Sequence, residues 1–181
     1  MRVRLKGMAL VVALALAGVP ANAAEIFTPV EDMTVRKSDS NLDNKYVRTY
    51  GYDAGFADSR GVVEFGLNES LSGKNVDSAS LSFTEGQPGF SGRIDVFGFQ
   101  GDGVVDNSDA TMLDTRLGNV VNDDEVDGQR FELNVTSFLN DLAIADAEFA
   151  GIVFRSEDPA DPLVGSLSIC SSESPTFGGP Q

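Results

Sequence analysis

The stretch Asp77-Ser78-Ala79-Ser80-Leu81-Ser82-Phe83 decides the fold class of this 181-residue chain. Ala79, Leu81 and Phe83 alternate with three serines, so the apolar side chains share one side of an extended backbone. This period of two residues is typical of a β-strand with one face buried and the other in water. We therefore predict a strand here, in a sheet that covers a hydrophobic core.

The same alternation recurs along the chain, between clusters of Gly, Asn, Asp, Ser and Pro that favour turns. Thr136-Ser137 is expected to cap a short helical turn through Phe138, Leu139 and Leu142. Eight or so short strands with one helical turn predict an all-β fold, an antiparallel β-sandwich of the jelly-roll type. The other expected strands lie within residues 33–37, 45–50, 63–67, 93–99, 130–136, 150–154 and 163–169.

Residues 1–23 have the layout of a secretory signal peptide: a positive start, an apolar run from Met8 to Val19, and small residues before a cut after Ala23. The apolar run is shorter than the roughly 20 residues that a membrane-spanning helix needs, which disfavours the alternative of an N-terminal anchor. We therefore expect a secreted, extracellular protein, with residues 24–170 forming the β-sandwich domain.

The remaining 158 residues suit one domain with a core of its own, and the last of them, 171–181, form an irregular Gly- and Ser-rich tail. The chain has no His, which excludes Ser-His-Asp or Cys-His catalysis and a His-ligated zinc site. Its single cysteine, Cys170, excludes a disulfide within the chain. Cys170 is expected to be buried as a small apolar residue, and the alternative is pairing between molecules.

The chain is strongly acidic, with a net charge of −15. Removing Arg2, Arg4 and Lys6 with the signal peptide takes the charge from −15 to −18. This balance argues against nucleic acid and anionic membranes as partners, because affinity for them comes from Lys and Arg. It suits a monomer in a salty or calcium-bearing medium outside the cell.

The order of these patterns resembles the secreted bacterial DNRLRE-type domains, which are related to disaggregatase repeats and to a group of carbohydrate-binding modules. The stretches that carry the resemblance are Asp32-Met33-Thr34-Val35-Arg36, the loop from Asn41 to Asn44 with Tyr46-Val47-Arg48, Arg60 to Leu67, Val76 to Leu81, Val96-Phe97-Gly98, Val135-Thr136 and Ser171-Ser172-Glu173.

The resemblance covers nearly all of the chain after the signal peptide, although each motif is mostly a strand pattern. Two departures stand out: the tryptophans usual in such domains are absent around 107–113, and a last apolar strand is not seen before Gln181. The second departure leaves two alternatives, a chain cut before its last strand or a sheet with an open edge. The resemblance implies a non-catalytic domain that binds glycan or matrix outside the cell.

Basic and aromatic residues concentrate between positions 36 and 60, which hold all three tyrosines and five of the ten Lys and Arg residues that follow the signal peptide. Tyr46, Arg48 and Tyr50 alternate, so they would share one face of a strand, and Arg60 leads the next strand. Tyrosine rings stack on sugars, and arginine binds carboxylate or sulfate through two parallel hydrogen bonds. We predict these four residues as a site for an anionic polysaccharide; the alternative is an outer sheet face with paired Arg and half-buried Tyr.

Asp102, Asp106 and Asp109 form a candidate calcium site in a stretch that resembles half of a dockerin or EF-hand loop. The match is partial, because the first and third loop positions would be Gly98 and Gln100. The alternatives are an acidic loop between strands, or calcium held by the acidic clusters at 123–127 or 157–161.

The sequence thus predicts a secreted module that binds an extracellular, anionic polysaccharide without cleaving it, with calcium as its only candidate cofactor. A structural module of a cell surface or biofilm matrix, stabilised by calcium, is the first alternative. A jelly-roll polysaccharide lyase, with a Tyr base and an Arg that neutralises charge, is the second.

Overall fold

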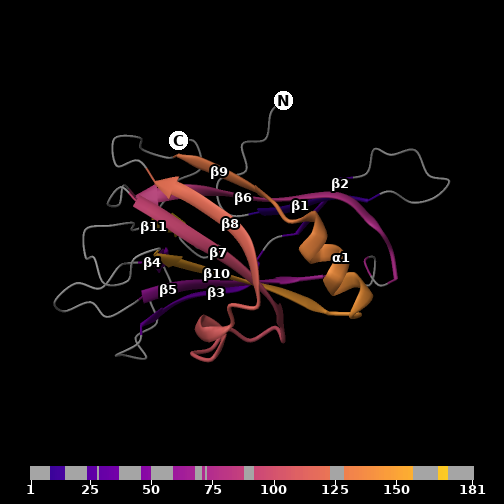
Figure 1. Ribbon diagram of the computed structural model, residues 1–181. Coiled ribbons are helices and arrows are strands. Elements are labelled where there is room, and N and C mark those ends of the chain that lie inside the picture. The colour runs from indigo at the N-terminus through magenta and orange to yellow at the C-terminus, as the bar shows by residue number, and fades with distance from the viewer. Residues whose placement is uncertain are drawn as a thin grey trace, which may run out of the picture.

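The structure is a computed structural model that describes residues 9–14, 24–27, 29–36, 46–49, 59–67, 71, 73–87, 92–122, 129–156 and 167–170. Its strands pair antiparallel in two sheets (Figure 1). The first sheet has the order β2-β1-β6-β11-β4, with β9 also beside β6, and the second has the order β3-β5-β10-β7-β8.

The strands of the first sheet are β1 (Ala9–Leu14), β2 (Ala24–Phe27), β4 (Tyr46–Thr49), β6 (Val76–Gln87), β9 (Arg130–Asn134) and β11 (Leu167–Cys170). Those of the second sheet are β3 (Pro29–Arg36), β5 (Ser59–Gly66), β7 (Gly92–Gly101), β8 (Thr115–Asn122) and β10 (Phe149–Ser156). The helical elements are η1 (Asp109–Thr111), a 3-10 turn, and α1 (Thr136–Ile144). The prediction of an all-β antiparallel sandwich is confirmed, while the jelly-roll topology stays a prediction.

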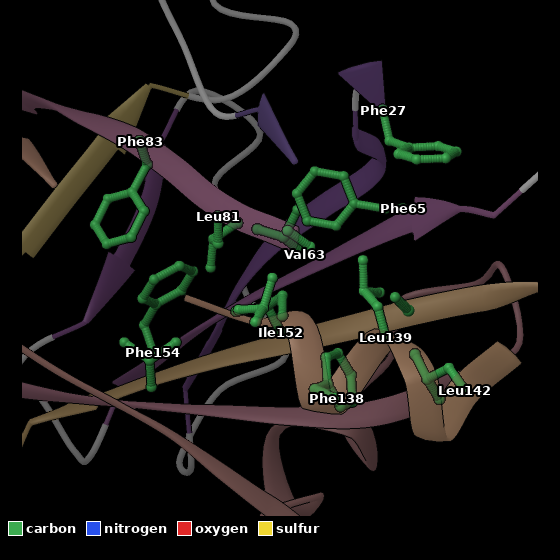
Figure 2. Close-up of a cluster of buried hydrophobic side chains, with 14 of the residues drawn as sticks. Phe27, Val63, Phe65, Leu81, Phe83, Phe138, Leu139, Leu142, Ile152 and Phe154 are labelled. Carbon is green, nitrogen blue, oxygen red and sulfur yellow. The ribbon is translucent and has the colours of Figure 1, made fainter. Parts of the chain in front are cut away.

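The main core lies between the two sheets and is closed by the apolar side of α1 (Figure 2). Phe83 from β6 packs against Phe154 from β10, with ring centroids 5.1 Å apart and planes at 75°, and Phe131 from β9 lies 5.2 Å from the same Phe83 ring. The alternating residues of the opening stretch, Ala79, Leu81 and Phe83, are all buried. Strand periodicity therefore identified the core-facing side correctly.

Helix α1 is joined to strand β6 by polar contacts at its first two turns. The Thr136 hydroxyl accepts the Ala79 N–H at 2.9 Å, and the Asn140 side-chain amide accepts the Val76 N–H at 2.8 Å and donates to its carbonyl oxygen at 3.0 Å. The prediction that Thr136-Ser137 caps the helix is wrong: Val135 is the N-cap, without a capping side chain. Thr136 is the first residue of the helix, and its hydroxyl hydrogen-bonds to the backbone of β6 instead.

A second, smaller core lies on the outer face of the second sheet. The segment 102–114, which contains η1, folds back over β5, β7 and β10 there, and Val105 and Ala110 pack with Val62, Phe97 and Val153. This segment connects β7 to β8, two neighbouring strands of the second sheet, and it packs on the outer face of that same sheet. Both faces of the second sheet are therefore partly apolar, which the alternating patterns did not predict.

Candidate functional site

The outer face of the second sheet, beside the small core, holds a group of charged side chains. Arg93, Asp95 and Phe97 alternate on β7 and point outward, because their neighbours Ile94 and Val96 belong to the main core. On β10, Arg155 lies directly opposite Asp95, and on β8, Arg116 lies opposite Phe97. Strand pairing thus brings together residues that are far apart in the sequence.

Three arginines converge on one carboxylate at this place, and we name the group Arg93, Asp95, Arg116 and Arg155 the arginine cluster. The Arg116 guanidinium lies 2.7 Å from Asp95 Oδ1, Arg155 Nη2 lies 3.6 Å from Oδ2, and Arg93 Nε lies 3.8 Å from Oδ1. Arg155 also lies over the Phe97 ring, 5.1 Å from its centroid, in a cation–π contact. Ion pairs and ring contact together fix the positions of the arginines.

Burial differs sharply within the arginine cluster. The Asp95 side chain is only 10% exposed, whereas those of Arg116, Arg93 and Arg155 are 48%, 38% and 27% exposed. Three positive charges around one buried negative charge make this patch basic in a chain of net charge −15. Guanidinium groups held in place at a surface are suited to binding carboxylate, sulfate or phosphate through paired hydrogen bonds.

A buried carboxylate, Glu64 of β5, lies under the segment that forms the small core. Glu64 is completely buried, and its carboxylate accepts the Gly103 N–H at 2.6 Å and the Asp102 N–H at 3.4 Å. Burial raises the pKa of Glu64, and the negative charges of Asp109 and Asp102 act in the same direction, although the two backbone N–H groups oppose them.

Gly101 leaves room for Glu64, and Gly103 allows a backbone conformation that other residues rarely adopt. A Cβ at position 101 would lie within 3 Å of the Glu64 carboxylate, and Gly103 has a φ of +89° with the Phe149 ring against it. Since larger residues would collide there or be strained, the sequence Gly101-Asp102-Gly103 is fitted to this buried acid. Glu64 thus acts as a clamp on the start of the 102–114 segment.

The three predicted calcium ligands lie in this same segment, where each organises the local backbone. Asp102 Oδ1 accepts the Val104 N–H at 3.0 Å, Asp109 Oδ2 accepts the Asp106 N–H at 2.7 Å, and Asp106 Oδ1 accepts both the N–H and the hydroxyl of Ser108 at 2.6 Å. The Ser108 contacts lower the pKa of Asp106.

Within the described residues, no three His, Cys, Asp or Glu side chains are arranged to hold a metal ion. The alternative clusters at 123–127 and 157–161 lie outside the described residues, so they are not tested. Calcium binding by this chain therefore stays a prediction.

The predicted polysaccharide site is divided between the two sheets. Tyr46 and Arg48 belong to β4 of the first sheet, where they lie opposite Cys170 and Ser168 of β11, while Arg60 belongs to β5 of the second sheet. The Arg60 guanidinium donates to the Ala110 carbonyl oxygen at 2.6 Å and so holds η1 against the sheet. Tyr50 lies outside the described residues, and a joint site of these four residues stays a prediction.

Sequence reasoning missed the arginine cluster because its members come from three strands and only Arg93 and Asp95 are near each other in sequence. The one visible sign was the charge alternation inside the predicted strand 93–99, where Arg93 and Asp95 stand on the face opposite the apolar residues. Arg116 was invisible, because β8 itself was not predicted.

No family model and no curated protein matches this chain. The likeness to DNRLRE-type domains therefore stays an expectation. Among the described residues, no helix is long and apolar enough to cross a membrane.

Proposed function

We propose that this chain is a secreted, non-catalytic β-sandwich module that binds an extracellular anionic polysaccharide through the arginine cluster. The observation that carries the proposal is the convergence of three partly exposed guanidinium groups on the buried Asp95. The carboxylate and Phe97 orient the arginines before any ligand arrives, which reduces the entropy lost on binding.

The form of the patch favours a polymer over a small anion. Its arginines come from the adjacent strands β8, β7 and β10, which are spaced about 4.8 Å apart in a sheet, so they form a row across the strands. A chain that carries one acidic group on many sugars could place successive groups along this row. Carboxylate and sulfate both fit guanidinium geometry, so the cluster selects acidic glycans as a class.

The overall negative charge sets the conditions for such binding. It repels every polyanion at long range, and it repels DNA most, because DNA carries a charge about every 1.7 Å. At physiological salt this repulsion is screened beyond about 8 Å, while contacts at the cluster remain. A polysaccharide of lower charge density in a saline medium is therefore the partner that fits best.

Retardation in gels cast with alginate, pectin, sulfated galactan, xylan or no polymer tests this proposal, each run with and without a chelator. We expect retardation by an acidic polymer and none by xylan. Arg116→Ala and Arg93→Ala should each reduce it. The matched control is Arg130→Ala, because Arg130 is exposed on β9 of the other sheet, where its Nε donates to the Ser82 hydroxyl at 3.1 Å.

Other results of these experiments would support a different site or one of the alternative functions. Loss of retardation in Arg48→Ala and Tyr50→Ala, with Arg116→Ala unaffected, would move the site to the predicted cluster near β4. Loss with chelator would add calcium. An absorbing unsaturated product from a uronate polymer would indicate a lyase, and no retardation in any gel would favour a structural matrix module and contradict the proposal.

A further inference from the structure

The apolar run predicted as the centre of the signal peptide occupies a place in the first sheet. Its residues Ala9–Leu14 form β1, which lies between β2 and β6 (Figure 1). β1 pairs antiparallel with β6 from Ala9 opposite Ser82 to Leu14 opposite Val76. The edge of β6 over residues 76–82 is thus a seat for one extended strand.

The hydrogen bonds of Ala79 show which edge of β6 this is. The Ala79 N–H donates to Thr136, and its carbonyl oxygen accepts the Val135 N–H at 3.0 Å, so the backbone groups of Ala79 face the side of β9 and α1. Backbone groups alternate in direction along a strand, so those of Ser78 and Ser80 face the opposite edge, where β1 lies. These groups lose their partners if β1 is removed.

The same edge lacks the Lys, Arg and Pro residues that protect many natural edge strands, although a bulge interrupts its pairing between Val76 and Ser78. Residues 76–85 contain no Lys, Arg or Pro, and their only charged residues are Asp77 and Glu85. Ser78 is exposed on the outer face, while Ala79 and Leu81 point into the core. An edge with small outer side chains and an apolar inner side is a template for pairing with another strand.

We propose that removal of residues 1–23 opens this edge of β6 and that the same edge of a second copy of this chain pairs with it. The inference rests on cleavage after Ala23, not on polysaccharide binding. Two identical edges that meet antiparallel form a twofold symmetric contact, which needs no other partner and joins two sheets into one. The resulting dimer differs from the monomer that the sequence alone suggests.

Strand β2 is a poorer replacement for β1. It has only four residues, whereas six residues of β6 pair with β1. Its last residue, Phe27, is buried in the main core, and β3 of the opposite sheet begins at Pro29. A second β6 has the matching length and brings its own apolar inner side to the seam.

The test uses the protein processed by signal peptidase and purified from the secreting host, with its N-terminus at Ala24 verified by mass. Light scattering across a range of concentrations, at low and high salt, should show a dimer that high salt strengthens, because each copy carries a large negative charge. Ser78→Lys places a charge on the edge and should weaken dimerisation by about tenfold or more.

Ser137→Lys is the matched control, since it makes the same charge change at an exposed position on α1. It should leave the dimer intact. Circular dichroism checks that each variant folds, and Ser78→Pro, which removes an edge N–H without adding charge, replaces Ser78→Lys if that variant does not fold.

Four results would overturn the proposal. If the purified protein still contains residues 1–23, β1 stays paired with β6 and the edge is not opened. A processed chain that stays monomeric shows that no second copy binds, and hydrogen exchange at Ser78 and Ser80 then tells whether another segment of the chain fills the edge. A dimer unaffected by both Ser78 variants assembles elsewhere, and a dimer weakened equally by Ser137→Lys responds only to charge. None of these results affects the arginine cluster, which lies on the other sheet.

Discussion

The two faces of the second sheet come from the same strands but hold different chemistry. The inner face is mostly apolar and packs on the main core, with Ser59, Asn122 and Ser156 as its buried polar residues, whereas the outer face combines a small core, the buried Glu64 and the arginine cluster. Apolar burial explains why the sheet folds, but burying a carboxylate has a cost that folding does not require. The difference directs the search for function to the outer face.

The largest expected effect lies on the inner face. Phe154→Ala removes a fully buried ring that packs edge-on against Phe83, and we expect a loss of about 3–5 kcal/mol in the free energy of unfolding. Urea unfolding measures it. A loss below about 1 kcal/mol would mean that the main core can repack, and would weaken the contrast between the faces.

Gly151→Ala disturbs only the outer face and should cost about 1–3 kcal/mol. A Cβ at this position would overlap the ring of Phe99, a buried member of the small core. Thermal unfolding of Gly151→Ala alone and combined with Phe99→Leu tests the cause. The double variant should recover part of the loss, and no recovery would show that the strain arises elsewhere.

Glu64→Gln should change how stability depends on pH. Burial raises the pKa of Glu64 above its ordinary value of 4.5, so the folded chain binds this proton more readily than the unfolded chain. The stabilising contribution is therefore complete below the unfolded pKa and is lost as the pH rises through the folded pKa. The stability of the wild type relative to Glu64→Gln should fall as the pH rises through that window.

Asp106→Asn is the control of opposite sign for that measurement. The Ser108 hydroxyl and N–H lower the pKa of Asp106, so its contribution is present above the unfolded pKa and is lost as the pH falls. Urea unfolding of both variants and the wild type across the acid range separates the two. Parallel curves for Glu64→Gln and the wild type would show that Glu64 titrates alike in both states.

Arg116→Ala should have the smallest effect on stability, within about 0.5 kcal/mol, because the side chain is 48% exposed and exposed ion pairs contribute little. Its effect on polysaccharide retardation should be large by comparison. Unfolding and gel retardation of the same preparation give both numbers. A substantial stability loss with unchanged retardation would make the cluster a structural ion-pair network.

Much of the fold could be predicted because half-buried strands leave a local period-two pattern. The alternating apolar residues of β5, β6 and β10, and the apolar positions Phe138, Leu139 and Leu142 of α1, all proved to be core residues. β8 was not predicted because apolar and polar residues do not alternate along it. Val120 and Val121 are both apolar, yet Val120 is buried and Val121 is 61% exposed at the edge of the sheet.

The candidate site could not be predicted to the same degree, because it depends on strand register. Arg155 and Asp95 are neighbours only through the pairing of β10 with β7, and a shift of one residue would place Arg155 on the inner face. Alternation within the predicted strand 63–67 places Glu64 on the face opposite Val63 and Phe65, but its burial depends on the 102–114 segment that covers it. A local pattern contains neither kind of information.

The amide of Asn140 pairs with both backbone groups of Val76, 64 residues earlier in the chain, and this contact bears on the order of folding. The backbone hydrogen bonds at the start of β6 form only when α1 packs against it, and α1 follows β7, β8 and β9 in the chain. Contacts of such long sequence separation form slowly, because the chain loses the entropy of closing a large loop before the contacts can stabilise it. The Val76 amide should therefore gain protection from hydrogen exchange together with α1, in a late step of refolding.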